Sequence, residues 1–196
     1  MTTPPLRKGR IVIFSAPSGA GKTTIVHEVL RRLSCLEFSV SATTRPKREH
    51  EINGRDYYFL SEEKFRHYVQ KGSFLEWEEV YPGRFYGTFF TEVDRIISHG
   101  NSAVFDVDVK GGLNIKRHYQ GEALAIFIMP PSPEALRERL EKRGTEDQAE
   151  IDKRMARVME ELDRAPEFDR MVYNEDLETA IQETTQLIRD FLNLPE

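Results

Sequence analysis

A short glycine-rich run that ends in a lysine and two threonines lies near the start of the chain, between Ser15 and Thr24. Glycines let backbone N–H groups converge on phosphate oxygens, and the positive end of a following helix attracts the same anion. Lys22 would then bridge the β- and γ-phosphates of ATP, and the Thr23 hydroxyl would bind Mg²⁺, a cation that prefers oxygen ligands. The run therefore predicts a phosphate-binding P-loop. We expect its ATP-binding residues to be Ala16, Pro17, Ser18, Gly19, Ala20, Gly21, Lys22, Thr23 and, as a weaker candidate, Thr24.

One position departs from the usual P-loop pattern, G-x-x-x-x-G-K-[ST]. Its first glycine is replaced by Ala16, which can still make the turn if its φ stays negative. The alternative interpretation is an ordinary glycine-rich turn with a solvated lysine. Because the run follows a predicted strand and opens a predicted helix, which is the context that a P-loop requires, we favour phosphate binding.

A second candidate metal ligand, a carboxylate, lies at the end of another apolar stretch. Asp106 lies near the end of Ala103–Val107, which we interpret as a strand. In a parallel sheet this strand end would lie beside the P-loop, so Asp106 is a candidate on the metal side of the site. The alternative is a helix cap, a common role for aspartate after a strand.

Further segments, spread in order over nearly the whole chain, resemble the guanylate kinase family. This resemblance implies an enzyme that transfers the γ-phosphoryl group of Mg-ATP to GMP. The matching segments are SVSATTRPKR at 39–48, NGRDYY at 53–58, FLEW at 74–77, YGT at 86–88, DVD at 106–108, RLEKRGT at 139–145 and KR at 153–154.

The resemblance also implies a fold and a division of the chain. The fold would be α/β, with a P-loop NTPase-type parallel sheet covered by helices and with inserted GMP-binding and lid subdomains. A single domain over 1–196 would have its core at 8–40, 91–136 and 165–196. The GMP-binding part would be 41–90 and the mobile lid 137–164.

By the same resemblance, the phosphate and the guanine of GMP would be held by two different sets of residues. The phosphate would be held by Arg45, Arg48, Tyr57 and Tyr86, the guanine by Ser41, Glu76, Thr88 and Asp108, and Glu51 would also lie on the substrate side. The chemistry agrees, because guanidinium groups grip phosphate oxygens with two parallel charge-assisted bonds. Guanine presents N1–H beside an amino group, which suits carboxylates, whereas adenine has an acceptor at N1. Taken singly, each of these residues could be a surface ion pair or an ordinary strand residue.

The implied reaction needs charge neutralisation more than a general base, because a nucleotide phosphate is already ionised near neutral pH. Lys22 and Arg45 would act there together with the lid arginines Arg139, Arg143 and Arg154, which the resemblance makes candidates. The resemblance also suggests that Arg143 could instead stack on adenine, and Asn174, after the last expected strand, could border that base. The alternative for the lid is a solvated helix pair with Glu–Arg contacts.

Hydrophobic periodicity predicts the elements that would position these residues. One helix is expected over Lys22–Leu33, another from Ser132 to Arg143 with its end at Gly144, and a third along Leu177–Leu192. Trp77 is expected in the core, because an indole on an alternating strand is more often packed than bound to ligand. The expected core strands are Ile11–Phe14, Phe38–Ser41, Ala103–Val107, Ala123–Met129 and Met171–Tyr173.

Composition limits the class of partner. The net charge of -5 provides no basic field for nucleic acid, and no apolar run approaches the ~20 residues of a membrane span. The single cysteine, Cys35, cannot form an internal disulfide, which favours the cytoplasm. We therefore expect small-molecule substrates, GMP and ATP, with no nucleic-acid or membrane partner, while a monomer and a homo-oligomer both stay open.

Two other functions remain as alternatives. In a guanylate-kinase-like interaction module the same fold binds a phosphorylated peptide without catalysis. Such modules typically have degraded P-loops, whereas Lys22 and Thr23 are intact here. A switch GTPase would need an Asn-Lys-x-Asp motif, which the sequence lacks. Both alternatives are therefore less favoured than the kinase.

Overall fold

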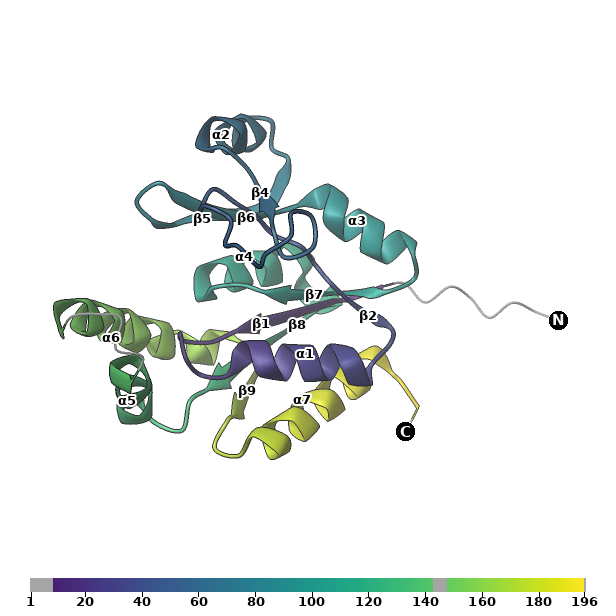
Figure 1. The fold of residues 1–196 in the computed structure, drawn as a ribbon. Coiled ribbons are helices and arrows are strands. Elements are labelled where there is room, and N and C mark those ends of the chain that lie inside the picture. The colour runs from purple at the N-terminus through teal and green to yellow at the C-terminus, as the bar shows by residue number, and fades with distance from the viewer. Residues whose placement is uncertain (1–8, 143–147, 196) are drawn as a thin grey trace. The chain divides into compact units, whose positions relative to one another are not determined.

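A parallel sheet of five strands in the order β2-β7-β1-β8-β9 forms the core of the chain (Figure 1). Its inner strands are apolar and buried along almost their whole length, as expected of a parallel sheet covered by helices on both faces. The predicted α/β, P-loop NTPase-type fold is therefore confirmed. The strands are β1 (Ile11–Ser15), β2 (Leu36–Phe38), β7 (Ser102–Asp106), β8 (Ala123–Met129) and β9 (Arg170–Tyr173).

The computed structural model describes residues 9–142 and 148–195. Two units can be distinguished by the contacts within them. One comprises residues 1–11 and 35–104, and the other comprises residues 12–34 and 105–196.

In the second unit, helices follow the strands that carry the candidate ATP-binding residues. Helix α1 (Lys22–Arg32) begins directly after the glycine-rich run and packs on α7 (Leu177–Leu192), which also contacts β9. Helix α4 (Val109–Tyr119) packs against β8 and is followed by the short 3₁₀ helix η1 (Gln120–Glu122). The observed bounds of α1 and α7 agree closely with the prediction.

Two further helices of this unit pack on each other. Helix α5 (Pro133–Lys142) begins after Ser132, whose hydroxyl accepts a hydrogen bond from the Ala135 amide at 3.1 Å, as the Ser-Pro-Glu start predicts. Helix α6 (Gln148–Asp163) leads to the 3₁₀ helix η2 (Ala165–Glu167). The predicted helix end at Arg143 and Gly144 lies outside the described residues. The two helices share a buried cluster of Leu136, Ile151, Met155 and Val158.

The first unit contains a second sheet, of four strands in the order β4-β3-β6-β5. Helix α2 (Glu62–Gln70) is capped by Ser61 and buries Phe65 against the sheet, and α3 (Phe90–Ser98) leads back to β7. Phe65, Phe74 and Phe85 form an aromatic core there, with the Phe65 and Phe74 rings stacked at 4.5 Å. The strands are β3 (Ala42–Thr43), β4 (Tyr58–Phe59), β5 (Phe74–Tyr81) and β6 (Arg84–Phe89).

Two predictions about this unit were wrong. The expected strand Phe38–Ser41 is not one element, because β2 ends at Phe38 and the chain passes into β3 of the other sheet at Ala42. Trp77 is not in the core but 42% exposed. Side chains alternate along a strand, and the residue of β5 that faces inward is its neighbour Glu76, which is 7% exposed.

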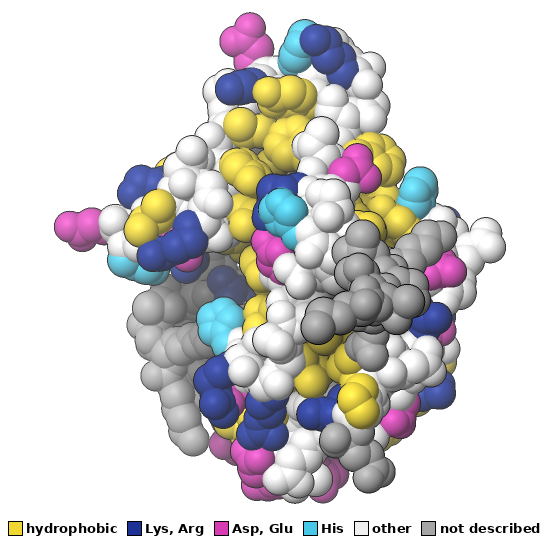
Figure 2. Space-filling model, turned by 90° about the vertical axis from the view of Figure 1, so that its right-hand side faces the viewer, with side chains coloured by type: hydrophobic (Ala, Val, Ile, Leu, Met, Phe, Trp, Pro, Cys, Tyr) yellow, Lys and Arg dark blue, Asp and Glu magenta, His cyan; other side chains and the backbone are white. Residues whose placement is uncertain are grey.

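The surface carries mixed charge. On the face shown in Figure 2, Lys and Arg side chains lie among Asp and Glu side chains rather than in one basic field. Within the part of the chain that the structure describes, no helix is long and apolar enough to cross a membrane.

Candidate functional site

The glycine-rich run makes a tight turn between β1 and α1. The Ala20 amide donates to the Pro17 carbonyl at 3.1 Å, and Gly19 and Gly21 have φ values of 90° and 93°, which favour glycine. Among the described residues, Ala16 is not one of those with positive φ. Alanine therefore fits this position without backbone strain, as expected.

The side chain of Asn174, the residue that follows β9, binds the backbone of this loop. Asn174 is buried, and its Nδ2 donates to the Ala20 carbonyl at 2.7 Å. A Cβ atom on Gly21 would lie 2.3 Å from the same nitrogen. Asn174 thus fixes the loop backbone. The position of Asn174 in the sequence does not reveal this contact.

Lys22 and Thr23 both approach Asp106 at the end of β7. Lys22 forms an ion pair with Asp106 Oδ1, and the Thr23 hydroxyl donates to Oδ2 at 3.5 Å. The Lys22 side chain is only 18% exposed. Burial lowers the pKa of Lys22 to about 8, although the negative charges of Asp108 and Glu161 oppose this shift. The structure therefore brings the predicted lysine, hydroxyl and carboxylate together.

Asp108 directly precedes α4, and both its side chain and its backbone carbonyl accept hydrogen bonds. Its Oδ1 accepts the Gly111 amide at 2.8 Å, which makes it the helix cap. The buried Ser15 hydroxyl lies 3.1 Å from the carbonyl oxygens of both Val107 and Asp108. A Cβ on Gly112 would lie 2.6 Å from that hydroxyl oxygen, so only glycine leaves room for it.

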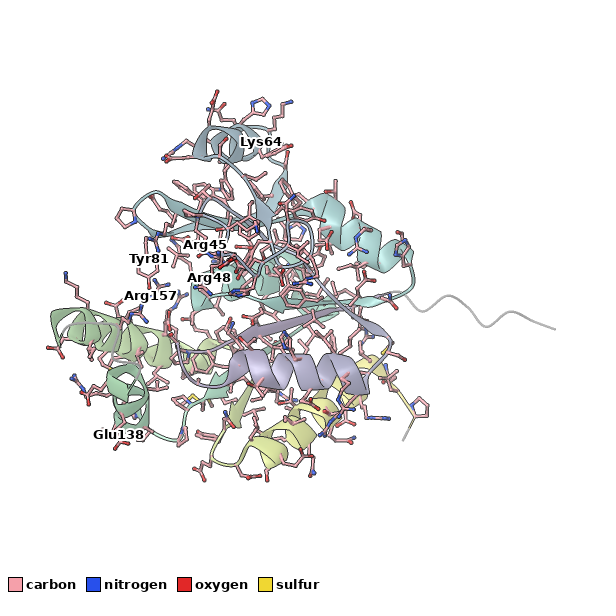
Figure 3. All side chains as sticks on the ribbon, viewed as in Figure 1. Arg45, Arg48, Lys64, Tyr81, Glu138 and Arg157 are labelled. Atoms are coloured by element: carbon pink, nitrogen blue, oxygen red, sulfur yellow. The ribbon has the colours of Figure 1, made fainter. Side chains whose placement is uncertain are left out.

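Sequence reasoning missed Arg157, labelled on α6 in Figure 3. Its Nη2 lies 3.6 Å from Asp108 Oδ2, and its Nε donates to Glu161 at 3.0 Å. Burial raises the pKa of Glu161, against the effect of Arg157. The signal was available, because Arg157 and Glu161 are four residues apart and Arg157 follows Arg154 by three on the same helix.

The other lid candidates are described to different extents. Arg154 lies on α6 and is partly buried. Arg139 lies within α5, but its side chain is outside the described part of the structure, and Arg143 lies wholly outside the described residues.

In the first unit, Ser41, Thr88 and Glu76 form a chain of oxygen atoms. The Thr88 hydroxyl donates to Glu76 Oε1 at 2.9 Å, and the Ser41 hydroxyl lies 3.4 Å from that of Thr88. Glu76 is 7% exposed and Thr88 is fully buried. They are directly opposite each other in the antiparallel pair of β5 and β6, which explains why two residues 12 apart in the sequence meet. The cluster offers acceptors to a ligand rich in N–H groups.

A cationic cluster lies in the loop after β3, where Figure 3 labels Arg45 and Arg48. Arg45 makes a two-pronged pair with the buried Glu51 carboxylate, at 2.7 and 2.5 Å, and lies 4.8 Å from the centre of the Tyr57 ring. The Arg48 amide donates to Glu51 at 2.8 Å. The pairing with Arg45 lowers the pKa of Glu51 to about 2.

Two tyrosines complete this cluster. The Tyr57 and Tyr86 rings meet edge to face at 6.1 Å. Burial raises the pKa of Tyr57, as does Tyr86, whereas Arg45 lowers it. The phenol therefore stays protonated and can donate a hydrogen bond to an anion.

Comparisons with known proteins agree with this geometry. A family model described as guanylate kinase matches residues 8–191. The guanylate kinase of Salinibacter ruber is 50% identical over 93% of this chain and 97% of its own length, and that of Bacteroides thetaiotaomicron is 48% identical over 94% and 91%. A crystal structure of guanylate kinase from Anaplasma phagocytophilum aligns with a TM-score of 0.73 at 29% identity, covering 95% of this chain and 86% of that one. With a loop that can bind phosphates, a buried carboxylate and hydroxyl cluster, and matches over nearly its whole length, the chain belongs to the guanylate kinase family.

Proposed function

We propose that the chain transfers the γ-phosphoryl group of ATP to GMP, giving ADP and GDP. The observation that carries this proposal is the Ser41–Thr88–Glu76 chain, in which Thr88 and Glu76 are buried, present in a protein whose P-loop keeps Lys22 and Thr23. Guanine offers N1–H and its amino group to such acceptors, whereas adenine offers an acceptor at N1. We propose cytoplasm as the place of action, in keeping with the single cysteine.

On the donor side, we infer that the loop 16–24 cradles the ATP phosphates. Lys22 would leave Asp106 to contact the β- and γ-phosphates. The Thr23 hydroxyl and the Asp106 carboxylate lie within 3.5 Å of each other and supply the oxygen ligands that Mg²⁺ prefers, so they fit a magnesium site. Bound Mg²⁺ would neutralise charge on the phosphates.

On the acceptor side, Arg45, Arg48, Tyr57 and Tyr86 would hold the GMP phosphate. Glu51 supports this role indirectly, because it fixes the Arg45 guanidinium and the backbone of Arg48. Glu76 is proposed as the main guanine acceptor and Asp108 as a second one. Asp108 Oδ1 caps α4, so only Oδ2, which lies 3.6 Å from Arg157 Nη2, would be left to accept a hydrogen bond from the base.

For transfer itself, we propose the three-part organisation that the family resemblance implies, with a core at 8–40, 91–136 and 165–196, a GMP-binding part at 41–90 and a lid at 137–164. The lid arginines Arg139, Arg143 and Arg154 would reach the phosphates when both nucleotides are bound. Exclusion of water then prevents hydrolysis of ATP. The non-catalytic peptide-binding alternative is not favoured, since the chain matches enzymes over nearly their full length.

A coupled assay for ADP tests this proposal. ADP should form from Mg-ATP only when GMP is added, and GDP should appear in equal amount. The Lys22→Met variant should lose transfer while its affinity for GMP, measured by calorimetry, stays close to that of the wild type, because Lys22 contacts only the donor. ADP formation that does not depend on GMP, or full turnover in Lys22→Met, would reject the assignment.

A further inference from the structure

Glu92 is a buried carboxylate that the reaction described above does not use. It lies on α3, is 4% exposed, and both of its oxygens accept hydrogen bonds. Oε1 accepts from the Val40 amide at 3.1 Å, and Oε2 accepts from the Tyr58 hydroxyl at 3.2 Å. Burying a carboxylate costs free energy unless charged or polar partners compensate for its desolvation.

Arg95 supplies that compensation. One turn further along α3, its Nη2 donates to Glu92 Oε1 at 2.9 Å and its Nε to Oε2 at 3.2 Å. A third nitrogen of the same guanidinium donates to Glu37 of β2 at 2.5 Å, and Glu37 also accepts from Asn101 at 2.9 Å. The network therefore has two ends, one at Glu92 and one at Glu37, joined by Arg95.

The Glu92 end lies where the chain leaves one sheet and enters the other. Val40 belongs to the segment 39–41 between β2 and β3, and Tyr58 lies on β4, the neighbour of β3. The Tyr58 amide donates to the Ser41 carbonyl at 2.9 Å. Glu92 thus binds the residue before Ser41 and also the residue that holds the Ser41 backbone.

Among the described residues, the hydroxyl groups of this segment itself do little to fix its backbone. The Ser39 hydroxyl is buried and has no hydrogen-bond partner within the described part of the chain, so it does not anchor the backbone there. The Ser41 hydroxyl lies 3.4 Å from Thr88, the hydroxyl that donates to Glu76. A displacement of the 40–41 backbone would therefore change the spacing of the acceptors in the proposed guanine site.

We propose that Glu92 is a positioning residue for guanine recognition, which acts by fixing the backbone of Val40 and Ser41. This inference rests on the proposed function of the Ser41–Thr88–Glu76 chain. Its consequence is specific, because loss of the Glu92 contacts should weaken GMP binding and leave ATP binding unchanged.

Glu92→Gln is the test variant, because an amide keeps the size but directs an N–H₂ group toward donors. We expect a rise in KM for GMP of about ten- to a hundredfold, because displaced acceptors would leave buried hydrogen-bonding groups poorly paired with the base. KM for ATP and kcat at saturating substrates should stay at the wild-type values. Glu37→Gln is the matched control: it breaks the other end of the Arg95 network, so its melting temperature should fall while its KM for GMP does not change.

If Glu92→Gln fails to fold, Tyr58→Phe removes one donor to the same carboxylate and should raise KM for GMP by a smaller factor. Calorimetric titration of each variant with GMP alone separates this inference from the proposed function. If the wild type binds GMP but transfers no phosphoryl group, the function is wrong while the titrations still test Glu92. Equal GMP affinity in the wild type, Glu92→Gln and Tyr58→Phe, or an equal loss in Glu37→Gln, would overturn the proposal.

Discussion

At the scale of single residues, Lys22 combines two properties that are seldom found together in a lysine. It must be charged to attract the triphosphate, yet it lies largely buried beside Asp106. Burial lowers its pKa to about 8, so the ammonium form dominates at neutral pH and the neutral amine dominates above that value. The binding of a polyanion favours the charged form and so raises the pKa of Lys22 again.

We therefore expect ATP affinity to be nearly constant around pH 7 and to fall as the pH rises through about 8, because the free protein must then take up a proton to bind. Fluorescence titration with Mg-ATP at several pH values between about 7 and 9 measures this. Lys22→Arg is the control, since a guanidinium stays charged over the whole range. A wild-type affinity that does not fall above pH 8 would contradict the assigned role.

Ala16 gives a second expectation for a single residue. Its φ is not positive, so replacing it with glycine removes no strain and adds only freedom to the unfolded chain. Ala16→Gly should lower the free energy of unfolding by about 0.4–1 kcal/mol and leave kcat and KM for ATP unchanged. Urea unfolding and steady-state kinetics measure the two effects. An increase in kcat would mean that the alanine restricts the loop.

At the scale of elements, helix α6 of the proposed lid presents two arginines three residues apart, Arg154 and Arg157. Arg157 is engaged with Glu161 and Asp108. If Arg154 contacts the transferring group mainly in the transition state, Arg154→Ala should lower kcat and kcat/KM together, by about 10³-fold, with little change in GMP affinity.

A matched control is Arg164→Ala, just after α6. Arg164 pairs with Glu167 at 2.8 Å and is 39% exposed, so its loss should cost at most about 1 kcal/mol of stability and no activity. Single-turnover kinetics with both substrates saturating decides between the two. A wild-type rate in Arg154→Ala removes that residue from the site.

The elements also show what could be predicted from sequence. Helices α1 and α7 were predicted closely because their apolar residues recur at helical spacing, and β8 because it is a long apolar run. The stretch around Ser41 was not predicted correctly. It was expected to be one strand, but the chain leaves β2 of one sheet at Phe38 and enters β3 of the other sheet at Ala42. Periodicity reports that a segment is extended but not which sheet it joins.

At the scale of the whole molecule, the sequence motif predicts one part of the candidate site, and the fold reveals contacts that the motif does not. The P-loop is local in sequence, so its turn between β1 and α1 could be predicted from the motif. Two contacts that hold parts of the proposed sites could not be predicted: Asn174 reaches Ala20 of the P-loop from 154 positions away, and Glu92 reaches Val40 beside the proposed guanine site from 52. Such pairs depend on how strands are ordered in the sheet, which the sequence alone does not specify.

The carboxylates of the proposed guanine site should select guanine over adenine. Glu76 accepts N–H groups, so adenine would place its N1 acceptor against an anion. Glu76→Gln should therefore raise KM for GMP strongly and KM for ATP little, since the amide has lost a charged acceptor. Retention of wild-type KM for GMP in this variant would exclude Glu76 from base recognition.

The most direct test is to measure kcat/KM for GMP and for AMP with the wild-type protein and saturating Mg-ATP. Buried polar groups that are left unpaired by the wrong base reject it strongly, so GMP should be preferred by up to about 10⁴-fold. Comparable kcat/KM values for the two nucleotides would contradict the account, because the Ser41–Thr88–Glu76 chain would then not select the base.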